Sequence, residues 1–211
     1  MIAIVDYRAG NLTSVARAME DLDIPCKVTA NPDEILNAER VVFPGVGAAG
    51  KAMEMLRETG LDQVIRKVFE NGVPLLGICL GTQIVLERSE ENDTTCLGIL
   101  KGATRGFASE FAQLKDKALK IPHMGWNQVR FLRMHPVFKD ISETSDFYFV
   151  HSYFPDPADR ELRIGVTDYG VTFASVLACR NLVATQFHPE KSGPVGLAIL
   201  KNFSKWDGRS G

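Results

Sequence analysis

A cysteine stands at the end of an aliphatic run, with a glycine two positions away on either side. The run "VPLLGIC" (73–79) is typical of a buried strand, and a helix is expected from about Leu80. Gly77-Ile78-Cys79-Leu80-Gly81 has the layout of a nucleophile elbow, a sharp strand-to-helix turn with a reactive side chain at its tip. Glycines permit the strained turn, the helix N-terminus favours a thiolate, and the Leu80 N–H would face an oxyanion. The alternative is a thiol that only fills space in the core.

A cysteine nucleophile needs a base, and the segment "ATQFHPEKS" (184–192) offers one. His188 and Glu190 project to the same face of an extended segment, roughly 7 Å apart at their Cα atoms. Glu190 can therefore orient one imidazole nitrogen while the other faces a thiol. Pro189 restricts its own φ and the conformation of His188. Alone, this pattern is also typical of a surface ion pair; beside the elbow it indicates a Cys–His–Glu triad.

The first ninety residues alternate short aliphatic strands with helical patterns. Strands are expected at 2–6, 26–29, 40–45 and 73–79, and helices at 11–22, 31–39, 48–71 with a break at Gly60, and 80–88. This alternation predicts an α/β fold with a mostly parallel central sheet flanked by helices, in flavodoxin-like layers.

From about residue 96 the sequence becomes rich in short β segments. Residues 96–107 are expected to form a strand, a glycine turn and a second strand, and Asp168-Tyr169-Gly170 a hairpin turn. The tail from Val195 to Lys205 returns to helical spacing. We therefore predict an antiparallel β extension on the parallel half, in one domain that spans residues 1–211.

The fold class places the candidate residues at one edge of the sheet. In open α/β sheets, ligands bind beyond the carboxyl ends of the strands. Cys79 ends one predicted strand, His188 follows another, and "PGVG" (44–47) ends a third. If these strands are parallel, the three features meet, and the glycines of "PGVG" let its backbone supply a second oxyanion donor.

Composition excludes several classes of protein. The chain has 211 residues, 45% of them hydrophobic, with a net charge of −2, which does not fit a nucleic-acid or membrane-surface partner. The N-terminus lacks the pattern of a signal peptide, and no apolar run approaches the ~20 residues of a membrane span; we expect a cytoplasmic protein. Four cysteines and four histidines are scattered without metal or disulfide spacing, so we expect no metal and no cofactor.

Motifs along nearly the whole chain resemble the class I (triad-type) glutamine amidotransferases. Within that family the chain is most similar to the glutaminase subunits of imidazole glycerol phosphate synthase, which act in histidine biosynthesis. The motifs are "DYRAGNL" (6–12), "FPGVGAAGKAM" (43–53), "LLGICLGTQ" (75–83), "PHMGWN" (122–127), "FYFVHSY" (147–153) and "TQFHPEKSG" (185–193).

The resemblance implies a role for each matching residue. Cys79 would attack the side-chain amide carbon of glutamine and form a glutamyl thioester, His188 would carry the protons, and Glu190 would orient His188. The oxyanion would be held by the backbone of Val46, Gly47 and Leu80, and the glutamine by Gln83, Ser152 and Tyr153. For Gln83, on a helix, and Ser152, in a loop, the alternative is a purely structural role without contact to glutamine.

The same resemblance implies a partner. The family's glutaminases form heterodimers with a (β/α)8-barrel synthase (cyclase) subunit and channel ammonia to it. That subunit makes imidazole glycerol phosphate and aminoimidazole carboxamide ribotide. Asn11, Trp126 and Lys191 fall where the family has interface residues. Trp126 suits an interface anchor, although an indole packed in the core is an alternative, and Lys191 has the alternative of a solvated charge.

Some positions depart from the family pattern and leave further functions open. Arg8 stands where glycine is frequent, Ala49 replaces a common aromatic residue, and Thr82 replaces methionine. These departures are also compatible with a paralogous glutaminase that feeds ammonia to a sugar-amidating synthase. Another triad glutaminase, such as the subunit that serves pyridoxal phosphate synthesis, is a further alternative, which "PHMGWN" disfavours. A stand-alone γ-glutamyl hydrolase and a scaffold without catalysis stay open as well.

Overall fold

A central eight-stranded sheet organises the protein, for which a computed structural model describes residues 1–8, 12–113 and 119–209. The strand order is β2-β1-β3-β4-β14-β13-β12-β9. The strands from β2 to β14 in this order are parallel, and β13, β12 and β9 continue the sheet in antiparallel pairing. Their bounds are β1 Ile2–Val5, β2 Cys26–Thr29, β3 Arg40–Gly45, β4 Leu75–Cys79, β9 Arg130–Phe131, β12 Arg163–Tyr169, β13 Val171–Cys179 and β14 Leu182–Thr185.

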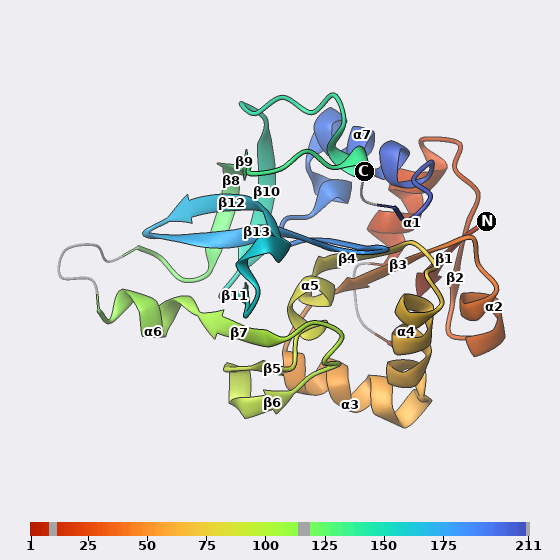
Figure 1. Ribbon diagram of the computed structural model, residues 1–211, viewed down its shortest axis with the longest axis horizontal. Coiled ribbons are helices and arrows are strands. Elements are labelled where there is room, and N and C mark those ends of the chain that lie inside the picture. The colour runs from red at the N-terminus through yellow and green to blue at the C-terminus, as the bar shows by residue number, and fades with distance from the viewer. Residues whose placement is uncertain (9–11, 114–118, 210–211) are drawn as a thin grey trace.

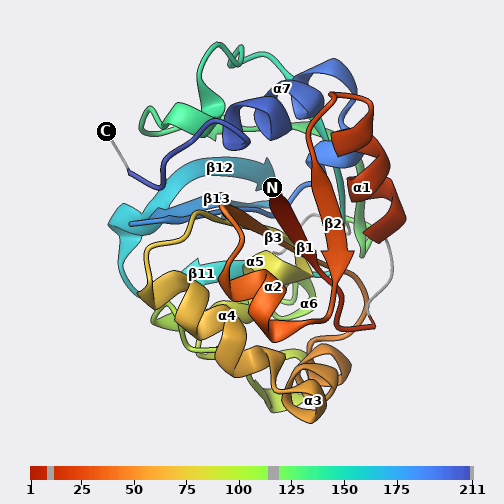
Figure 2. The same cartoon turned by 90° about the vertical axis from the view of Figure 1, so that its right-hand side faces the viewer.

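Helices cover both faces of the parallel half (Figures 1 and 2). Strand side chains alternate between the two faces: Ile4 of β1 packs in one apolar cluster with α1 and α7, and Val5 packs in the other with α2, α3 and α4. The helix bounds are α1 Leu12–Glu20, α2 Pro32–Leu36, α3 Ala49–Thr59, α4 Leu61–Glu70, α5 Leu80–Ile84, α6 Phe107–Phe111 and α7 Gly193–Phe203. The predicted fold class is therefore confirmed.

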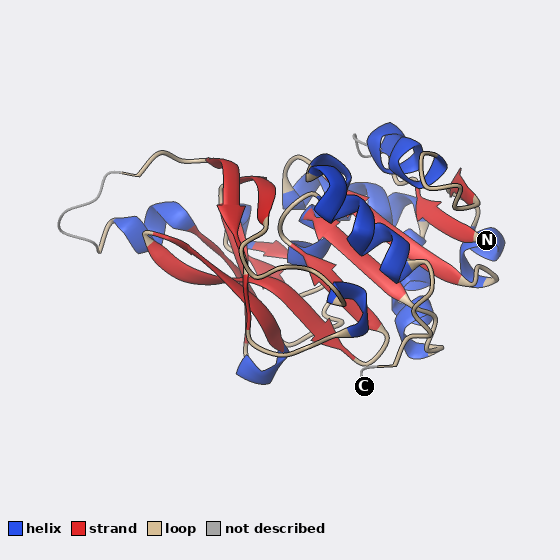
Figure 3. Ribbon diagram, turned by 90° about the horizontal axis from the view of Figure 1, so that it is seen from above, coloured by secondary structure: helices blue, strands red, loops and turns tan. Residues whose placement is uncertain are grey.

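Two smaller sheets extend the molecule on the antiparallel side (Figure 3). One has the order β11-β7-β5-β6, and the other is the antiparallel pair β10-β8. Their strands are β5 Arg88–Ser89, β6 Thr94–Thr95, β7 Gly102–Gly106, β8 His123–Gln128, β10 Asp146–His151 and β11 Tyr153–Pro157. Short 3-10 turns lie at Glu91–Asp93 (η1), Pro136–Phe138 (η2), Arg160–Leu162 (η3) and Pro189–Lys191 (η4).

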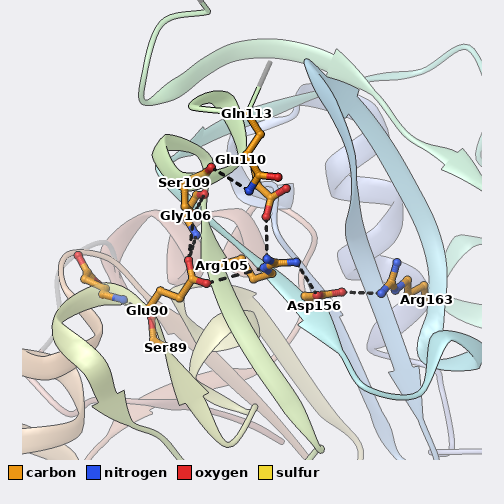
Figure 4. Close-up of polar contacts among 10 residues, drawn as sticks. Ser89, Glu90, Arg105, Gly106, Ser109, Glu110, Gln113, Asp156 and Arg163 are labelled. Carbon is orange, nitrogen blue, oxygen red and sulfur yellow. Dashed lines mark hydrogen bonds and ion pairs between the residues drawn. The ribbon is translucent and has the colours of Figure 1, made fainter. Parts of the chain in front are cut away.

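A network of charges ties the four-stranded sheet to the central one (Figure 4). The Arg105 guanidinium on β7 lies 3.0 Å from Glu110 of α6, 3.7 Å from Glu90 and 3.6 Å from Asp156 of β11. Asp156 in turn pairs with Arg163 of β12. These side chains are partly exposed, so each pair contributes little alone, but together they hold β11 between β7 and β12. That strand begins at Tyr153, one of the predicted site residues.

Several local predictions are confirmed and two are wrong. The helix break falls at Gly60, with φ of 70°, and the hairpin turn at Gly170, with φ of 72°. The helix expected at 80–88 ends at Ile84, because the carbonyls of Ile84, Val85 and Leu86 accept backbone N–H groups from residues 97, 100 and 98 instead of continuing a helix. For the same reason residues 96–100 follow this loop and form no strand of their own.

The junction of β4 and α5 is a tightly constrained turn. Cys79 adopts φ of 54° and ψ of −105°, a conformation that L-residues other than glycine rarely hold. Gly81 packs so closely on β3 that a Cβ atom there would lie 2.0 Å from the Phe43 carbonyl oxygen. At Gly77 a Cβ would approach Ala184 of β14 to 3.0 Å. The flanking glycines therefore let the elbow sit between β3 and β14.

Replacement of Gly81 should break this packing. We expect Gly81→Ala to lower the free energy of unfolding by about 3 kcal/mol, because backbone blocks the added methyl group. Chemical denaturation measures the change. Gly50→Ala, in the first turn of α3 with only the Thr94 hydroxyl at 3.3 Å, is the control and should change stability little. Equal losses in both variants would contradict the packing argument.

Candidate active site

Three neighbouring strands bring the predicted residues to one edge of the central sheet. Cys79 ends β4 and lies directly opposite Gly45, which ends β3. On the other side of β4 lies β14, and His188 follows it by three residues. The convergence that the sequence predicted at the carboxyl ends of the strands is present.

His188 and Glu190 form a buried pair. The Nδ1 atom of His188 lies 2.7 Å from Oε1 of Glu190, and the exposed fractions of the two side chains are 1% and 0%. Burial by itself lowers the pKa of His188, but the hydrogen bonds and charges of Cys79 and Glu190 outweigh it and raise that pKa to about 10. The site therefore favours a protonated imidazole at His188, between Cys79 and Glu190.

The Cys79 thiol has two polar neighbours besides the imidazole. Its sulfur lies 3.9 Å from the Val150 carbonyl, and the Nε2 group of Gln186 donates to the sulfur at 3.7 Å. The remaining ring nitrogen of His188, Nε2, is buried, and its polar neighbour is the Cys79 thiol. This nitrogen is therefore available to exchange a proton with the reacting groups beside the sulfur.

A cavity of about 330 Å³ opens in front of the thiol. Its volume suits a small metabolite. Its walls contain Val46, Gly47, Cys79, Leu80, Gln83, Glu91, Pro122, Val150, His151, Ser152, Tyr153 and His188. The structure thus brings together all nine predicted catalytic, oxyanion and glutamine-binding residues, eight of them in the cavity wall and Glu190 behind His188.

The backbone on the β3 side of the cavity passes through Val46 and Gly47. Gly47 has φ of 90°, and a Cβ atom there would meet no described atom within 4 Å. Leu80, on the opposite side of the thiol, begins α5. Val46 and Gly47 thus line the cavity on one side of the thiol and Leu80 lines it on the other.

Hydrogen bonds within the protein already use some of the donors and acceptors of the residues predicted to bind glutamine. Gln83 Nε2 donates to the Tyr153 carbonyl at 2.8 Å and to Gln186 Oε1 at 3.1 Å, which uses both of its hydrogens. The Ser152 carbonyl accepts the Phe107 N–H at 3.0 Å. Gln83 lines the cavity, and the side-chain atom that it has left for a further hydrogen bond is its oxygen, an acceptor.

Sequence reasoning missed three polar side chains of the site. Glu91 lines the cavity, and its carboxylate also accepts the Ala49 N–H at the start of α3 at 2.6 Å. His151 lines the cavity from β10, and Gln186 contacts the sulfur. Glu91 lies in an acidic run whose spacing matches no motif, so nothing in the sequence singled it out. Gln186 is two residues before His188, and this proximity to the predicted base was the only sequence feature that pointed to it.

The predicted interface residues fall into different classes. Trp126 on β8 is 58% exposed and Met124 on the same strand 63%, so the alternative of an indole packed in the core is wrong. Lys191 is exposed in η4. Asn11 lies outside the described residues. Arg8, where the family often has glycine, has φ of 65°, a left-handed conformation that explains the frequency of glycine there.

Two further properties of the described residues bear on function. Outside the undescribed segments, no group of three or more His, Cys, Asp or Glu side chains is arranged to hold a metal ion. None of the described helices has the length and apolar character that crossing a bilayer requires.

Comparison with known proteins gives close relatives by sequence. The profile of the family "Glutamine amidotransferase class-I" matches residues 3–206. The chain is 48% identical over 206 residues to the imidazole glycerol phosphate synthase subunit HisH of Nitratidesulfovibrio vulgaris strain DP4, covering 98% of this chain and 96% of the relative. The HisH subunit of Nitrosococcus oceani is 47% identical, with 99% of both chains covered.

Solved structures share the fold at lower identity. A crystal structure of a glutamine amidotransferase superposes with a TM-score of 0.71 at 15% identity, covering 96% of this chain and 99% of the other. A chain of PurLQS from Thermotoga maritima gives 0.72 at 17% identity, with 97% of both chains covered. These matches place the architecture in a widespread fold.

The raised pKa of His188 should appear in the pH dependence of stability. Folded His188 holds its proton up to a pKa of about 10, whereas an unfolded histidine releases it near 6.5. The stabilisation is therefore complete below pH 6.5 and is lost as pH rises toward 10, by up to about 1.4 kcal/mol per pH unit. Chemical denaturation between pH 6 and 10 should show a steeper fall for the unmodified protein than for His188→Gln.

His135 provides the control for this measurement. Burial, together with the charge of Arg133, lowers the pKa of His135 to about 4, so its contribution changes at acid pH only. His135→Gln should keep the alkaline fall. An equally flat profile in both variants would contradict the assignment to His188.

Proposed function

We propose that this chain, which belongs to the class-I glutamine amidotransferase family, is the glutaminase subunit of an imidazole glycerol phosphate synthase. It hydrolyses glutamine to glutamate and ammonia and passes the ammonia to a cyclase subunit in histidine biosynthesis. The family match over residues 3–206 and the HisH relatives support this function. We propose further that residues 1–211 form a single domain and that the protein acts in the cytoplasm.

The observation that carries the proposal is the strained cysteine beside a buried imidazole–carboxylate pair. Cys79 holds a positive φ at the strand end, and His188 and Glu190 lie 2.7 Å apart next to it. A nucleophile, a base and a group that orients the base are the parts that acyl transfer through a covalent intermediate requires.

The chemistry then follows from the positions of these groups. His188 takes the proton of the Cys79 thiol as the sulfur attacks the side-chain amide carbon of glutamine, and the oxyanion is held by backbone N–H groups at Val46, Gly47 and Leu80. His188 donates its proton to the departing ammonia, which leaves a glutamyl thioester. It next takes a proton from water, whose oxygen attacks the thioester, so that glutamate is released and the thiol is restored. Glu190 stabilises the imidazolium at both stages.

The other end of the substrate fits the polar wall of the cavity. An α-ammonium group needs acceptors, and Gln83 Oε1 and the Glu91 carboxylate are suitable side-chain acceptors there. An α-carboxylate needs donors, which the Ser152 hydroxyl and the backbone at Ser152 and Tyr153 can provide. This division of roles explains why the cavity wall combines the Glu91 carboxylate with the half-buried turn at Ser152 between β10 and β11.

Ammonia must reach the cyclase without loss to water, so we propose a heterodimer with a (β/α)8-barrel subunit. Trp126 and Met124 form an exposed apolar pair on β8, and Lys191 follows the triad in η4. Exposed aromatic side chains of this kind serve as interface anchors. Asn11 belongs to the same proposed interface.

Two competing functions predict different behaviour. A paralogue that feeds a sugar-amidating synthase would fail to support imidazole glycerol phosphate synthesis with a histidine-pathway cyclase. A stand-alone γ-glutamyl hydrolase would release glutamate equally fast with and without a partner. The high identity to HisH subunits favours the first proposal over both.

Removal of the nucleophile should separate the two activities of the complex. We expect Cys79→Ala to lower glutamine-dependent synthesis by a factor on the order of 10³ or more. Synthesis from added ammonium salt should persist, because it bypasses the thioester. Both rates are measured on the complex with the barrel subunit. Cys179→Ala, a cysteine away from the cavity, should leave both unchanged, and loss of the ammonia-dependent rate in Cys79→Ala would assign the thiol a different role.

Truncation of the exposed indole should weaken assembly. We expect Trp126→Ala to raise the Kd for the barrel subunit about 30-fold, the effect of losing a central aromatic anchor worth roughly 2 kcal/mol. Isothermal titration calorimetry measures the change. Met134→Ala is the control. Like Trp126, Met134 is exposed, at 79%, but it lies just before η2, which is bound to α7 by the hydrogen bond from Asn202 to the Val137 carbonyl. An unchanged Kd in Trp126→Ala would remove β8 from the interface.

A further inference from the structure

Two buried histidines lie beside the site, and the proposed chemistry uses neither. His123 of β8 and His151 of β10 are directly paired across the two strands. They are 3% and 5% exposed, and Nδ1 of His123 lies 2.9 Å from Nε2 of His151. One of these two nitrogens must donate and the other accept, so the direction of the bond depends on the partners at each end.

The partner at the outer end is Asn127, whose amide orientation is fixed by backbone. Its Oδ1 accepts the Gln128 N–H at 2.8 Å, and its Nδ2 donates to the Asp168 carbonyl at 3.1 Å. The same Nδ2 lies 3.2 Å from Nε2 of His123. Nε2 of His123 is therefore an acceptor, and the ring carries its proton on Nδ1, toward His151.

The partner at the inner end gives the same direction. Nδ1 of His151 lies 2.8 Å from the Tyr153 carbonyl oxygen. A carbonyl can only accept, so Nδ1 of His151 carries the proton and Nε2 accepts from His123. Both rings are neutral in this arrangement. Burial agrees with that state, since it lowers the pKa of His123 to about 4 and, with the nearby charges of His123 and His188, that of His151 to about 3.

The chain continues from Tyr153 to the reacting sulfur. The Tyr153 carbonyl also accepts from Gln83 Nε2 at 2.8 Å. The second hydrogen of that Nε2 goes to Gln186 Oε1 at 3.1 Å, which turns the Gln186 amide so that its Nε2 donates to the Cys79 sulfur at 3.7 Å. An amide turned the other way would direct its oxygen at the sulfur and repel a thiolate.

We propose that His123 and His151 are positioning residues, whose hydrogen bonds hold the Tyr153 carbonyl in place. That carbonyl orients the Gln83 amide, and Gln83 in turn orients Gln186 so that Gln186 donates to the Cys79 sulfur. The role of the sulfur in this inference rests on the proposed function. Side-chain amides have two nearly equivalent orientations, and a carbonyl, which can only accept, selects one of them. Gln186 then acts on the nucleophile directly, while the histidines act through it.

The test compares two substitutions of similar shape at His123. His123→Leu removes the donor to His151, whereas His123→Asn keeps an N–H group near the position of Nδ1. We expect His123→Leu to lower glutaminase kcat/KM of the complex about tenfold, the effect of one lost hydrogen bond next to an unpaired acceptor. Alkylation of Cys79 by iodoacetamide at pH 7, followed by mass spectrometry, should slow by a similar factor. His123→Asn should stay within about twofold of the unmodified protein in both assays.

Nitrogen-15 NMR of the imidazole rings reports the direction of the chain. Both histidines should be neutral with the proton on Nδ1 at pH 7, and His151 should lose this single tautomer in His123→Leu. Asn127→Asp is a second variant of nearly equal size, which replaces the donor at the outer end by an acceptor. It should move the His123 proton to Nε2 and slow alkylation of Cys79.

A role in packing alone gives a different pattern. His123 stacks on Tyr169 and Phe149, with ring centroids 4.0 and 4.9 Å away. Equal losses in His123→Leu and His123→Asn, or unchanged Cys79 alkylation in His123→Leu and Asn127→Asp, would overturn the proposal. Absence of glutaminase activity in the unmodified complex would overturn the proposed function instead, because the alkylation and NMR measurements need no glutamine.

Discussion

The turn at Cys79 is the constraint on which the site depends. A residue with φ of 54° at the end of a buried strand is unfavourable by itself. It is held between β3 and β14, which lie so close that a Cβ atom at Gly81 would overlap the Phe43 carbonyl and one at Gly77 would press on Ala184. The strain therefore has a structural result: the sulfur is lifted out of the sheet toward the cavity. The His188 imidazole, the backbone at Val46 and Gly47 and the rest of the cavity wall are all arranged around that one atom.

The parallel half and the triad were predictable because their signals are local. Glycines around Cys79 and the proline between His188 and Glu190 restrict the backbone within a few residues, and strand–helix alternation indicates which strand ends meet. The helix predicted to reach Arg88 failed for the opposite reason. Val85 and Leu86 continue its apolar pattern, but their carbonyls bind residues distant in sequence. Tertiary hydrogen bonds overrode the periodicity there.

The residues of the site that the sequence did not reveal are those whose roles come from three-dimensional neighbours. Gln186 and Glu91 have no spacing that distinguishes them from ordinary polar residues, and each gains its position from contact with an element far along the chain. Exposure is equally a tertiary property, so the choice between core and surface for Trp126 needed the structure. Patterns identify the reactive groups; the fold identifies the groups that orient them.

Strand β8 belongs to two environments at once. Its residues alternate between inward positions, such as His123, and outward positions, such as Trp126, as the pleat of a strand requires. A partner bound to the outer face and a substrate bound near the inner face would thus share one rigid backbone. By thermodynamic reciprocity, if the partner changes the affinity for glutamine by some factor, glutamine must change the affinity for the partner by the same factor. Substrate saturation would then report on assembly, and supply of nitrogen would be coupled to the presence of its consumer.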